Sequence, residues 1–457
     1  MIINMAVDVA ALKRVLGLFV CLCVTRTSLQ REDADGIVYS ADGKDTTAFG
    51  SAKPMRFLLY DVNPGEGFNL RRDVYIRVAN LVKFLNEDEP WTLVLPPWGR
   101  LYHWKSNIDQ IKVPWGTFFD LESLGRHVPV MEYKDFIKMS GGAVIEEVYY
   151  LQRYKEGWKD GKWEERMDIR DCLDQNYYHK DEEGAWRGWF WGYEETKAKK
   201  LQCLSVQAQA SSMKPFLMHN TTARSVMFPM AQTIIHGQWD RWSPWFWNAR
   251  RSMRFSKQLR DIADKFREQE LDSTDEKDRT VLLEDWTKMR RKHGDALGGP
   301  YLSIHLRRRD YLYAHKEEVP SLLYAAEQIK SGLEKHKLKT VFVATDAPKE
   351  EFEELKGYLQ GYKVVKYTPT KEVLESFKDG GIAIIDQWIC AHARVFIGSY
   401  VSTFSFRIQE EREILGFSQD VTYRRFCPDG QLTCEQPSKW VVKYDEENQG
   451  RGLHTEL

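Results

Sequence analysis

The sequence predicts an α/β protein built from two Rossmann-like domains that face each other. Strand patterns alternate with helical patterns in two regions, residues 56–97 and 301–415, and a less regular stretch separates them. Strands that alternate with helices of about 10–15 residues form βαβ units and parallel sheets. At 457 residues, of which 42% are hydrophobic, the chain is large enough for each domain to bury its own core.

The first region is predicted to form a strand, a loop, a helix and a second strand. Residues 56–62 (RFLLYDV) are mostly apolar and form a buried strand, and residues 63–69 (NPGEGFN) form a loop because of their Pro and Gly content. Apolar residues recur at helical spacing over residues 70–86. Residues 92–97 (TLVLPP) form the second strand, which ends at a proline pair.

The middle of the chain is less regular. Charged residues and tryptophans alternate over residues 147–200 without helical or strand periodicity, which predicts a surface elaboration with a disulfide inside it. A long helix is expected around residues 250–268. The strongly charged residues 269–285 are expected to form a solvent-exposed loop.

Regular alternation returns after a Gly-Gly-Pro sequence, and each strand is followed by a helix. We therefore expect an N-terminal domain over residues 53–246 and a C-terminal domain over residues 247–440. The strands expected in the second domain are 301–306, 341–345, 363–367 and 394–398, and its helices are 321–336, 349–360, 381–393 and 403–415.

Both ends of the chain carry targeting patterns. Basic residues precede the apolar run 15–24, which fits the core of a signal peptide over residues 1–28 and is too short to span a bilayer. The alternative for this run is a buried helix of the mature fold. A tail over residues 441–457 ends in HTEL, which resembles the receptor-read KDEL and HDEL signals. The two patterns together predict the lumen of the endoplasmic reticulum, a retrieval receptor as partner and no membrane span in the mature chain.

Cysteine usage agrees with an oxidising compartment. Five cysteines remain after a signal peptide is removed, and this odd number predicts two bridges and one free thiol. Cys427 and Cys434 flank a Pro-Asp-Gly turn, and Cys172 and Cys203 would close the Trp-rich stretch. Cys390 lies in an apolar helical segment and is expected to be buried and free.

Composition excludes one class of partner, and the motifs give no sign of a metal. The 66 basic and 67 acidic residues leave a net charge of -1, so there is no basic excess to bind nucleic acid. The sequence has no Cys-x-x-Cys pair, and its only Asp-x-Asp, at Asp33 and Asp35, precedes the folded part. Asn220 is in the only N-glycosylation sequon and is a candidate glycosylation site.

The loop Asn63-Pro-Gly-Glu-Gly-Phe-Asn69 is the first candidate site. Gly65 and Gly67 on either side of Glu66 let the backbone pass close to a ligand, while the carboxylate projects at the start of a helix. A plain turn is the alternative. The loop follows the first predicted strand, and parallel sheets place functional loops at the carboxyl ends of their strands.

The second candidate is the sequence His305-Leu-Arg307-Arg308-Arg309-Asp310, directly after a predicted buried strand. Three arginines at a strand end favour an anionic ligand, because a guanidinium binds phosphate with two hydrogen bonds and keeps its charge. The alternative is a solvated basic turn paired with Asp310. Adjacent side chains on an extended backbone point to opposite faces, so Arg308 is expected to matter least for a phosphate.

The third candidate combines Asp386 with the start of the last helix. Asp386 lies in an otherwise apolar helix, where a carboxylate is unfavourable unless it is hydrogen-bonded or faces a ligand. Ser402 and Thr403 stand where a helix offers free N–H groups to a pyrophosphate. The alternative is that Asp386 pairs with His392 or Arg394 and that Ser402 is only an N-cap.

Several of these motifs also carry a resemblance to a known family. The segments PGEGFN, LPPWGRLYHW, RGWFWGYEET, GGPYLSIHLRRRD, DGGIAIIDQWICAHARVFIG and VSTFSFR follow one another in a stretch from Arg56 to Trp440. In this order they resemble the GDP-fucose protein O-fucosyltransferases that modify thrombospondin type 1 repeats. The family usually has Pro where this chain has Gly65, which loosens the loop without moving its carboxylate.

The resemblance implies a GT-B fold, with a cleft between the two domains, and an inverting mechanism. It also implies GDP-fucose as donor, folded thrombospondin type 1 repeat proteins as acceptors, no metal requirement and no other cofactor. Glu66 matches the catalytic base of the family. The GDP-fucose contacts that the resemblance implies are Pro64, Gly65, Glu66, Gly67, Phe68, Asn69, His305, Leu306, Arg307, Asp386, Thr403 and Phe404.

The chemistry expected from the residues agrees with this resemblance. An inverting transfer needs one base for the acceptor proton and charge stabilisation for the leaving GDP. We expect Glu66 to be the base and Arg307, with the helix end at Thr403, to stabilise the leaving group. Two other classes remain open: a glycoside hydrolase that uses Glu66 and Asp386, and a non-catalytic lumenal chaperone or lectin that uses the Trp-rich surface.

Overall fold

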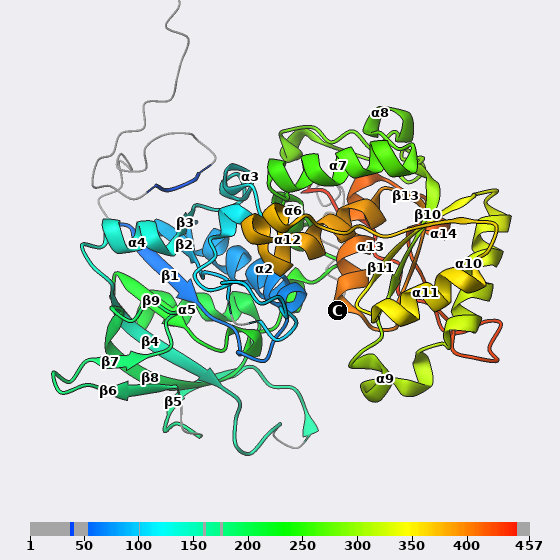
Figure 1. Cartoon of the computed structure of the whole chain (residues 1–457). Helices are drawn as coiled ribbons and strands as arrows, with labels where there is room; N and C mark the ends of the chain where they lie inside the picture. The colour runs from blue at the N-terminus through cyan, green and yellow to red at the C-terminus, as the bar shows by residue number, and fades with distance from the viewer. Residues whose placement is uncertain (1–36, 41–53, 100, 159–160, 174–176, 446–457) are drawn as a thin grey trace, which may run out of the picture. The chain divides into compact units, whose positions relative to one another are not determined.

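The computed structural model describes residues 37–40, 54–99, 101–158, 161–173 and 177–445 (Figure 1). All of these residues belong to one compact unit. The predicted signal peptide at residues 1–28 and the HTEL sequence at the C-terminus lie outside them. No helix in the described part of the chain is long and apolar enough to cross a membrane.

The first sheet has the order β3-β2-β1-β9-β4-β8-β7-β6, and β5 pairs with β8. The strands from β3 to β8 along this order are parallel, whereas β5, β6 and β7 pair antiparallel with their neighbours. The bounds are β1 Arg56–Tyr60, β2 Trp91–Leu95, β3 Val130–Glu132, β4 Val144–Gln152, β5 Arg166–Arg170, β6 Tyr178–Lys180, β7 Trp186–Gly188, β8 Lys197–Gln207 and β9 Ser225–Phe228.

The expectation of an irregular elaboration at residues 147–200 is wrong. This segment contains most of β4, all of β5, β6 and β7, and the start of β8, so it extends the first sheet. Every residue of β1 is buried, whereas β5 is exposed or half-exposed along its whole length. Edge strands that meet water on both faces need no alternation of apolar and polar residues, so their sequence carried no period-2 signal.

The second sheet is entirely parallel, with the order β12-β11-β10-β13-β14. Its parallel strand order agrees with the prediction of βαβ units and a parallel sheet. The bounds are β10 Gly299–Leu306, β11 Thr340–Thr345, β12 Lys363–Val365, β13 Ala393–Gly398 and β14 Arg424–Arg425.

Two predictions between and beside the sheets need correction. The helix expected at 250–268 is two helices, α6 (Pro244–Ser252) and α7 (Lys257–Leu271), and the predicted domain boundary at residue 246 falls inside α6. The segment 269–285 is not simply a solvent loop, because Ser273 and Asp278 are buried in it against Arg267 of α7. Helix α12 (Lys371–Ala391) is broken at Lys378, whose φ of 58° is not helical, so the helix predicted at 381–393 corresponds to its second part. The polar turns before the break were not predicted, because they lack the apolar pattern.

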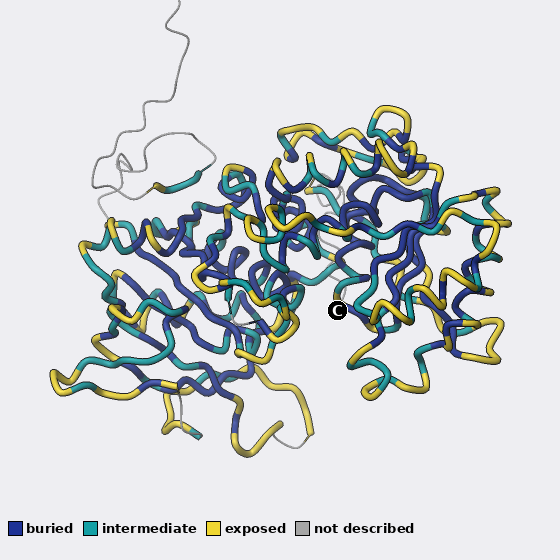
Figure 2. The backbone as a smooth tube through the Cα atoms, in the orientation of Figure 1, coloured by how far each residue is buried: buried dark blue, intermediate teal, exposed yellow. Residues whose placement is uncertain are grey.

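The remaining helices include the two that begin at the candidate site loops. The longer ones are α2 Phe68–Leu85, α10 Leu322–Lys335, α11 Lys349–Tyr358 and α13 Thr403–Leu415, and the shorter ones are α3 Leu121–Gly125, α4 Tyr133–Met139, α5 Met213–His219, α8 Asp275–Asp278, α9 Tyr311–Ala314 and α14 Gln419–Thr422. Figure 2 shows that the central strands of both sheets, among them β1 and β10, form the buried interior, whereas β5 at the edge is exposed or half-exposed.

A buried charge network joins helices beside the two sheets. Arg250 of α6 pairs with Glu410 of α13 at 2.7 Å, and Arg407 of α13 reaches the same carboxylate at 2.7 Å. Arg407 also lies 3.6 Å from Asp73 of α2. Loss of one partner from such a network leaves a buried charge unpaired, which is strongly unfavourable. The network therefore holds α13, whose N-terminus lies at the site, against α2, which follows the Glu66 loop.

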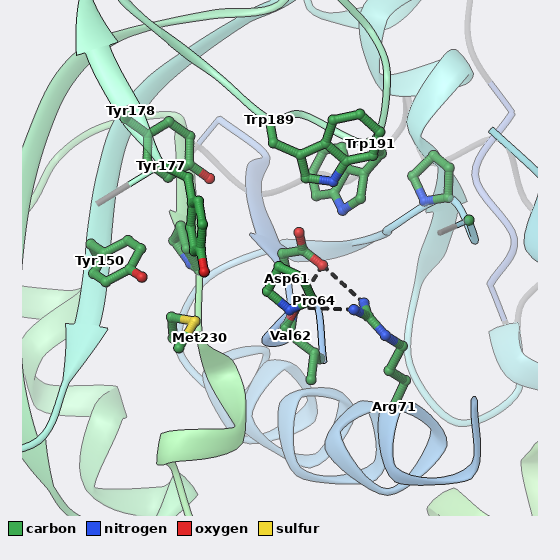
Figure 3. Close-up of a pocket in the computed structure, with 13 residues that line it drawn as sticks. Asp61, Val62, Pro64, Arg71, Tyr150, Tyr177, Tyr178, Trp189, Trp191 and Met230 are labelled. Atoms are coloured by element: carbon green, nitrogen blue, oxygen red, sulfur yellow. Dashed lines mark hydrogen bonds and ion pairs between the residues drawn. The ribbon is translucent and has the colours of Figure 1, made fainter. Parts of the chain in front are cut away.

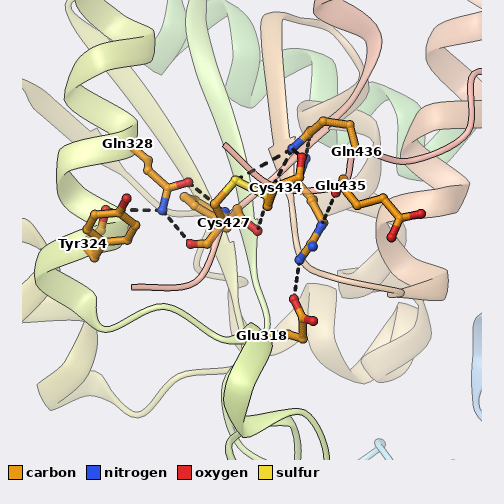
Figure 4. Close-up of a disulfide and its surroundings, with 9 residues drawn as sticks. Glu318, Tyr324, Gln328, Cys427, Cys434, Glu435 and Gln436 are labelled. Carbon is orange, nitrogen blue, oxygen red and sulfur yellow. Dashed lines mark hydrogen bonds and ion pairs between the residues drawn. A yellow bond between two sulfur atoms is a disulfide. The ribbon is translucent and has the colours of Figure 1, made fainter. Parts of the chain in front are cut away.

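Both predicted disulfides are confirmed. Cys172 bonds to Cys203 of β8, and Cys427 bonds to Cys434 next to the backbone of β14 (Figure 4). Cys390 is the free cysteine of the described residues, and it is buried in α12 as expected. Asn220, the candidate glycosylation residue, is exposed at the end of α5.

Candidate active site

The site is built from two loops that follow corresponding strands. In the first sheet β1 lies between β2, which follows it in the chain, and β9, which comes much later. In the second sheet β10 lies in the same way between β11, which follows it, and the later strand β13. Such a switch point opens a crevice at the carboxyl end of a parallel sheet. The Glu66 loop leaves β1 and the Arg307 segment leaves β10, so each starts at a switch point.

Arg71 of α2 organises the main chain of the Glu66 loop. Its Nε donates to the carbonyl oxygen of Glu66 at 3.2 Å, and its Nη2 donates to the carbonyls of Val62 and Asn63 at 3.1 Å each. Its Nη1 pairs with Asp61 at 3.1 Å. One guanidinium therefore holds three loop carbonyls, while the Glu66 side chain lines the cleft. Sequence reasoning missed Arg71, since nothing in the local sequence marks it apart from other helix-surface arginines.

The other end of the loop is fixed by packing and by a contact with α12. Phe68 is buried against Trp98, with ring centroids 4.9 Å apart, and against Phe118 at 5.4 Å. The Oδ1 of Asn69 accepts a hydrogen bond from Nε2 of Gln387 at 2.9 Å. The loop is thus attached both to the first sheet and to a helix of the second.

Arg307 lines the same cleft as Glu66 and is held in a fixed orientation. Its Nε and Nη2 donate to the two carboxylate oxygens of Asp310 at 2.9 and 3.0 Å, and its Nε lies 3.2 Å from Asp346. Burial alone would lower the pKa of the Arg307 guanidinium, but the hydrogen bond to Asp310 and the charge of Asp346 raise it above its usual value. Arg307 is therefore a permanently charged group that faces the cleft.

The residues on either side of Arg307 differ in whether they reach the cleft. Arg308 donates to Glu351, which lines the cleft, at 2.6 Å and to the carbonyl of Pro320 at 2.9 Å, and Arg308 itself does not line the cleft. Arg309 is exposed and lines the cleft. Leu306 is 2% exposed and belongs to the hydrophobic core, so only its backbone can meet a ligand. The alternation expected for an extended backbone is present here.

His103 joins the two loops, and sequence reasoning assigned it no role. Its Nδ1 lies 3.2 Å from Nη2 of Arg307, and a Cβ added to Gly67 would lie 3.1 Å from its ring. Glycine at position 67 therefore leaves room for the imidazole. Burial, together with the charge of Arg307, lowers the pKa of His103 below its usual value. A neutral ring can accept the hydrogen bond from Arg307.

A smaller cavity of about 310 Å³ lies next to Arg307 and is lined by His305, Phe404 and Asp386. The rings of His305 and Phe404 stack with their centroids 4.2 Å apart. Burial lowers the pKa of His305 to about 3, with a smaller effect from Arg307, and its Nδ1 contacts Ser405 Oγ at 2.9 Å. The ring is therefore neutral, with one flat face stacked on Phe404.

Asp386 faces this cavity with an unused oxygen. Burial raises the pKa of its carboxyl to about 7, and the charge of Lys366 opposes that rise. Its Oδ1 is buried and has no hydrogen-bond partner within the described residues. The alternative pairing is wrong, because Arg394 donates to the carbonyl of Gly298 and His392 lies 3.6 Å from Asp275.

The N-terminus of α13 completes the site. Ser402 occupies the N-cap position, but its side chain makes no capping hydrogen bond. Ser402, Thr403 and Phe404 line the cleft together. The free N–H groups at the start of a helix attract anions. This end of α13 is therefore suited to a phosphate group.

The cleft has a volume of about 1110 Å³ and collects most of the predicted residues. Asp386 and His305 line the adjoining cavity, Leu306 is in the core, and Pro64 lines a different cavity behind the loop. Within the described residues, no group of three or more His, Cys, Asp or Glu side chains could hold a metal ion. The predicted residues that line the cleft are Gly65, Glu66, Gly67, Phe68, Asn69, Arg307, Thr403 and Phe404.

Comparison with known proteins supports one family throughout. The family model of the GDP-fucose protein O-fucosyltransferases matches residues 57–415. Human GDP-fucose protein O-fucosyltransferase 2 is 56% identical over 396 residues, which cover 86% of this chain and 91% of that protein. The Caenorhabditis elegans protein of the same name is 46% identical over 406 residues, which cover 88% of this chain and 93% of that protein.

Solved structures agree on the fold. The crystal structure of POFUT1 with GDP-fucose has a TM-score of 0.53 at 16% identity and covers 82% of this chain and 99% of its own. The POFUT1 complex with GDP has a TM-score of 0.52 at 16% identity and covers 83% and 100%. The fold is the GT-B type that the sequence predicts. The chain thus belongs to the GDP-fucose protein O-fucosyltransferase family and is an enzyme that transfers fucose from GDP-fucose.

Proposed function

We propose that this enzyme transfers fucose, with inversion, to a Ser or Thr hydroxyl of folded thrombospondin type 1 repeats in the endoplasmic reticulum. One observation carries the mechanism: Glu66 and Arg307, from loops of two different sheets, line one cleft. The acceptor class rests on the motif resemblance described above. The donor follows from the family.

Glu66 is the base in this proposal. The acceptor hydroxyl loses its proton to the Glu66 carboxylate as its oxygen attacks C1 of fucose, and the bond between C1 and the β-phosphate oxygen breaks on the opposite face. GDP leaves with the bonding electron pair. Because attack and departure occur on opposite faces, one carboxylate is sufficient and the configuration inverts.

Arg307 and the first turn of α13 stabilise the negative charge that develops on GDP. Asp310 and Asp346 orient the guanidinium. Its Nη2 lies 3.2 Å from His103 in this structure, and a phosphate in the cleft can accept a hydrogen bond from this nitrogen in place of His103. Preorganised donors of this kind lower the barrier because they need not reorient during the reaction. Arg309 and Lys105 also line the cleft and add positive charge.

Asp386 and the stacked pair His305–Phe404 form the proposed site for the guanine base. A carboxylate that accepts hydrogen bonds from the base N1–H and amino group would use the Oδ1 that is otherwise buried without a partner. The flat ring of Phe404 and the neutral ring of His305 give the base apolar faces to lie against. This arrangement separates base recognition from the reacting end of the cleft.

We propose no divalent cation in the reaction, because Arg307 and the α13 N-terminus provide the positive charge at the diphosphate. The lumenal location is supported by the signal-peptide pattern, the HTEL tail, the two disulfides and the exposed Asn220. Deletion of residues 454–457 should release the protein into the medium, and continued retention would contradict the role of the tail.

The decisive experiment is incubation of the full chain with GDP-fucose and a folded thrombospondin type 1 repeat. Mass spectrometry should show one added fucose on the repeat, in step with GDP release. Free fucose without a modified repeat would indicate a hydrolase. Binding of the repeat without any turnover would indicate a chaperone or lectin.

A further inference from the structure

A second cavity lies behind the Glu66 loop, and nothing in the proposed reaction uses it (Figure 3). Its volume is about 270 Å³. Figure 3 shows Tyr150, Tyr177 and Tyr178 on one side and Trp189 and Trp191 on the other, with Asp61 between them and Arg71 paired to Asp61 below the tryptophans. The side chains that dominate its lining are Tyr150, Tyr177, Tyr178, Trp189, Trp191 and Met230.

The position of the cavity is that of a ligand site. It lies at the carboxyl edge of the first sheet, because Asp61 follows β1, Pro97 follows β2 and Pro229 follows β9. Ligands of open parallel sheets bind outside this edge, at the switch point where the Glu66 loop begins. Tyr177 at the cavity is 56% exposed, so the aromatic lining reaches the protein surface.

The cavity and the cleft share one wall. Val62 and Pro64 line the cavity, and Glu66, two residues further along the same loop, lines the cleft. Two residues of chain span at most about 7 Å. An acceptor segment that presents its hydroxyl to Glu66 therefore has a neighbouring side chain within reach of the cavity.

The chemistry of the lining selects the occupant. Arg71 is paired with Asp61 at 3.1 Å, and Asp61 also accepts from the backbone N–H of Val62 at 2.7 Å. The charge of the guanidinium is balanced, so the cavity has no excess of positive charge for a phosphate. Aromatic rings, Met and Pro form most of the remaining surface, which suits an apolar group.

We infer that this cavity binds an apolar side chain of the acceptor protein, aromatic or large aliphatic, close in space to the Ser or Thr that Glu66 deprotonates. The inference rests on the proposed function, because it assumes a protein acceptor in the cleft. It adds a specificity site: an acceptor without such a side chain should bind more weakly, although its hydroxyl can still react.

The test uses the full chain with saturating GDP-fucose and a folded thrombospondin type 1 repeat as the varied substrate. Tyr177→Ala and Trp189→Ala should each raise the KM for the repeat about three- to tenfold, as expected for loss of one aromatic contact. Because the contact is made before and during transfer, kcat should stay within about twofold. GDP affinity, measured by calorimetry, should not change.

Trp242→Ala is the matched control, since Trp242 is also 56% exposed but does not line the cavity or the cleft. An unchanged acceptor KM in Tyr177→Ala, or an equal rise in Trp242→Ala, would overturn the inference. Tyr177 is at the surface, so this variant should keep the wild-type melting temperature even if Trp189→Ala does not. Absence of transfer by the wild type would instead refute the proposed function.

Small probes identify the kind of group that enters. N-acetyltryptophanamide should inhibit competitively against the repeat and not against GDP-fucose, and Tyr177→Ala should weaken this inhibition. Inhibition by methyl glycosides with none by N-acetyltryptophanamide would mean that the aromatic lining binds a sugar, and would reject an apolar side chain as the occupant.

Discussion

The Nε of Arg71 donates a hydrogen bond of 3.2 Å to the main-chain carbonyl of Glu66, and the same guanidinium pairs with Asp61 at 3.1 Å. The proposed catalytic carboxylate therefore depends on an arginine five residues further along the chain, on the first turns of α2. Asp61 stands at the end of β1, so the loop is attached to the sheet at one end and to the helix at the other.

Arg71→Lys should reduce transfer by about 10- to 100-fold, because a displacement of about 1 Å in a catalytic group has effects of this size. A lysine keeps the charge next to Asp61 but cannot bind the carbonyls of Val62, Asn63 and Glu66 at the same time. Steady-state kinetics should show the loss in kcat, with GDP affinity unchanged.

Arg425→Lys is the matched control for this prediction. The Arg425 side chain is 8% exposed, against 13% for Arg71, pairs with Glu318 at 2.7 Å and binds the carbonyl of Glu435, but it lies outside the cleft. Equal losses in Arg71→Lys and Arg425→Lys would show that the effect comes from reduced stability and not from the loop.

Glu66→Gln should lower transfer by at least ~100-fold, the usual contribution of a general base. The amide is close in size to the carboxylate and lines the same cleft, so binding of GDP-fucose should persist. Calorimetry with GDP and single-turnover transfer assays separate the two effects. A variant with near-wild-type transfer would remove Glu66 from the mechanism.

Arg307→Lys should reduce turnover on the order of a hundredfold and affect GDP affinity less, because the bidentate contact matters most when charge develops on the β-phosphate. Arg308 provides the internal control, since its side chain binds Glu351 and the carbonyl of Pro320 and does not line the cleft. The three variants Arg307→Lys, Arg308→Lys and Arg309→Lys should be compared in turnover and GDP binding. Wild-type behaviour of Arg307→Lys beside failure of Arg308→Lys would contradict this assignment.

GDP binding should strengthen as pH rises towards 7 and then level off. Asp386 has a carboxyl pKa of about 7 in this structure and must be ionised to accept two hydrogen bonds from guanine. Below pH 7 the Asp386 carboxyl must lose a proton when GDP binds, so the affinity for GDP should fall by up to about tenfold per pH unit. Calorimetry in buffers of different ionisation enthalpy should detect the released proton, and Asp386→Asn should abolish both effects. A flat profile from pH 6 to 8, about one unit on each side of that pKa, would exclude Asp386 as the base-recognising group.

Transfer should survive EDTA, because the positive charge at the diphosphate is expected to come from Arg307 and the start of α13. The assay compares initial rates before chelation, after chelation and after addition of Mn²⁺ or Mg²⁺. Loss of activity on chelation with recovery on addition of a metal would contradict the metal-free proposal.

The local sequence was sufficient where an element is buried on both faces. The strand expected at residues 301–306 is β10, Gly299–Leu306, and the strand expected at 394–398 is β13, Ala393–Gly398. Runs of apolar residues bounded by Gly and Pro predict the position of such buried strands from the sequence alone. The strands within residues 147–200 were missed because their exposed faces tolerate charge and leave no period-2 pattern.

The sequence by itself determined the α/β class, the family, both disulfide pairs and the residues on the strand-end loops, because these depend on composition and on neighbours along the chain. Only the tertiary structure decided which of those residues share a cleft. His103 acts through a contact with Arg307 on another element, Arg71 acts across its loop, and the aromatic cavity combines residues from widely separated segments. Such contacts arise from how the two sheets and their helices pack, and no local pattern encodes them.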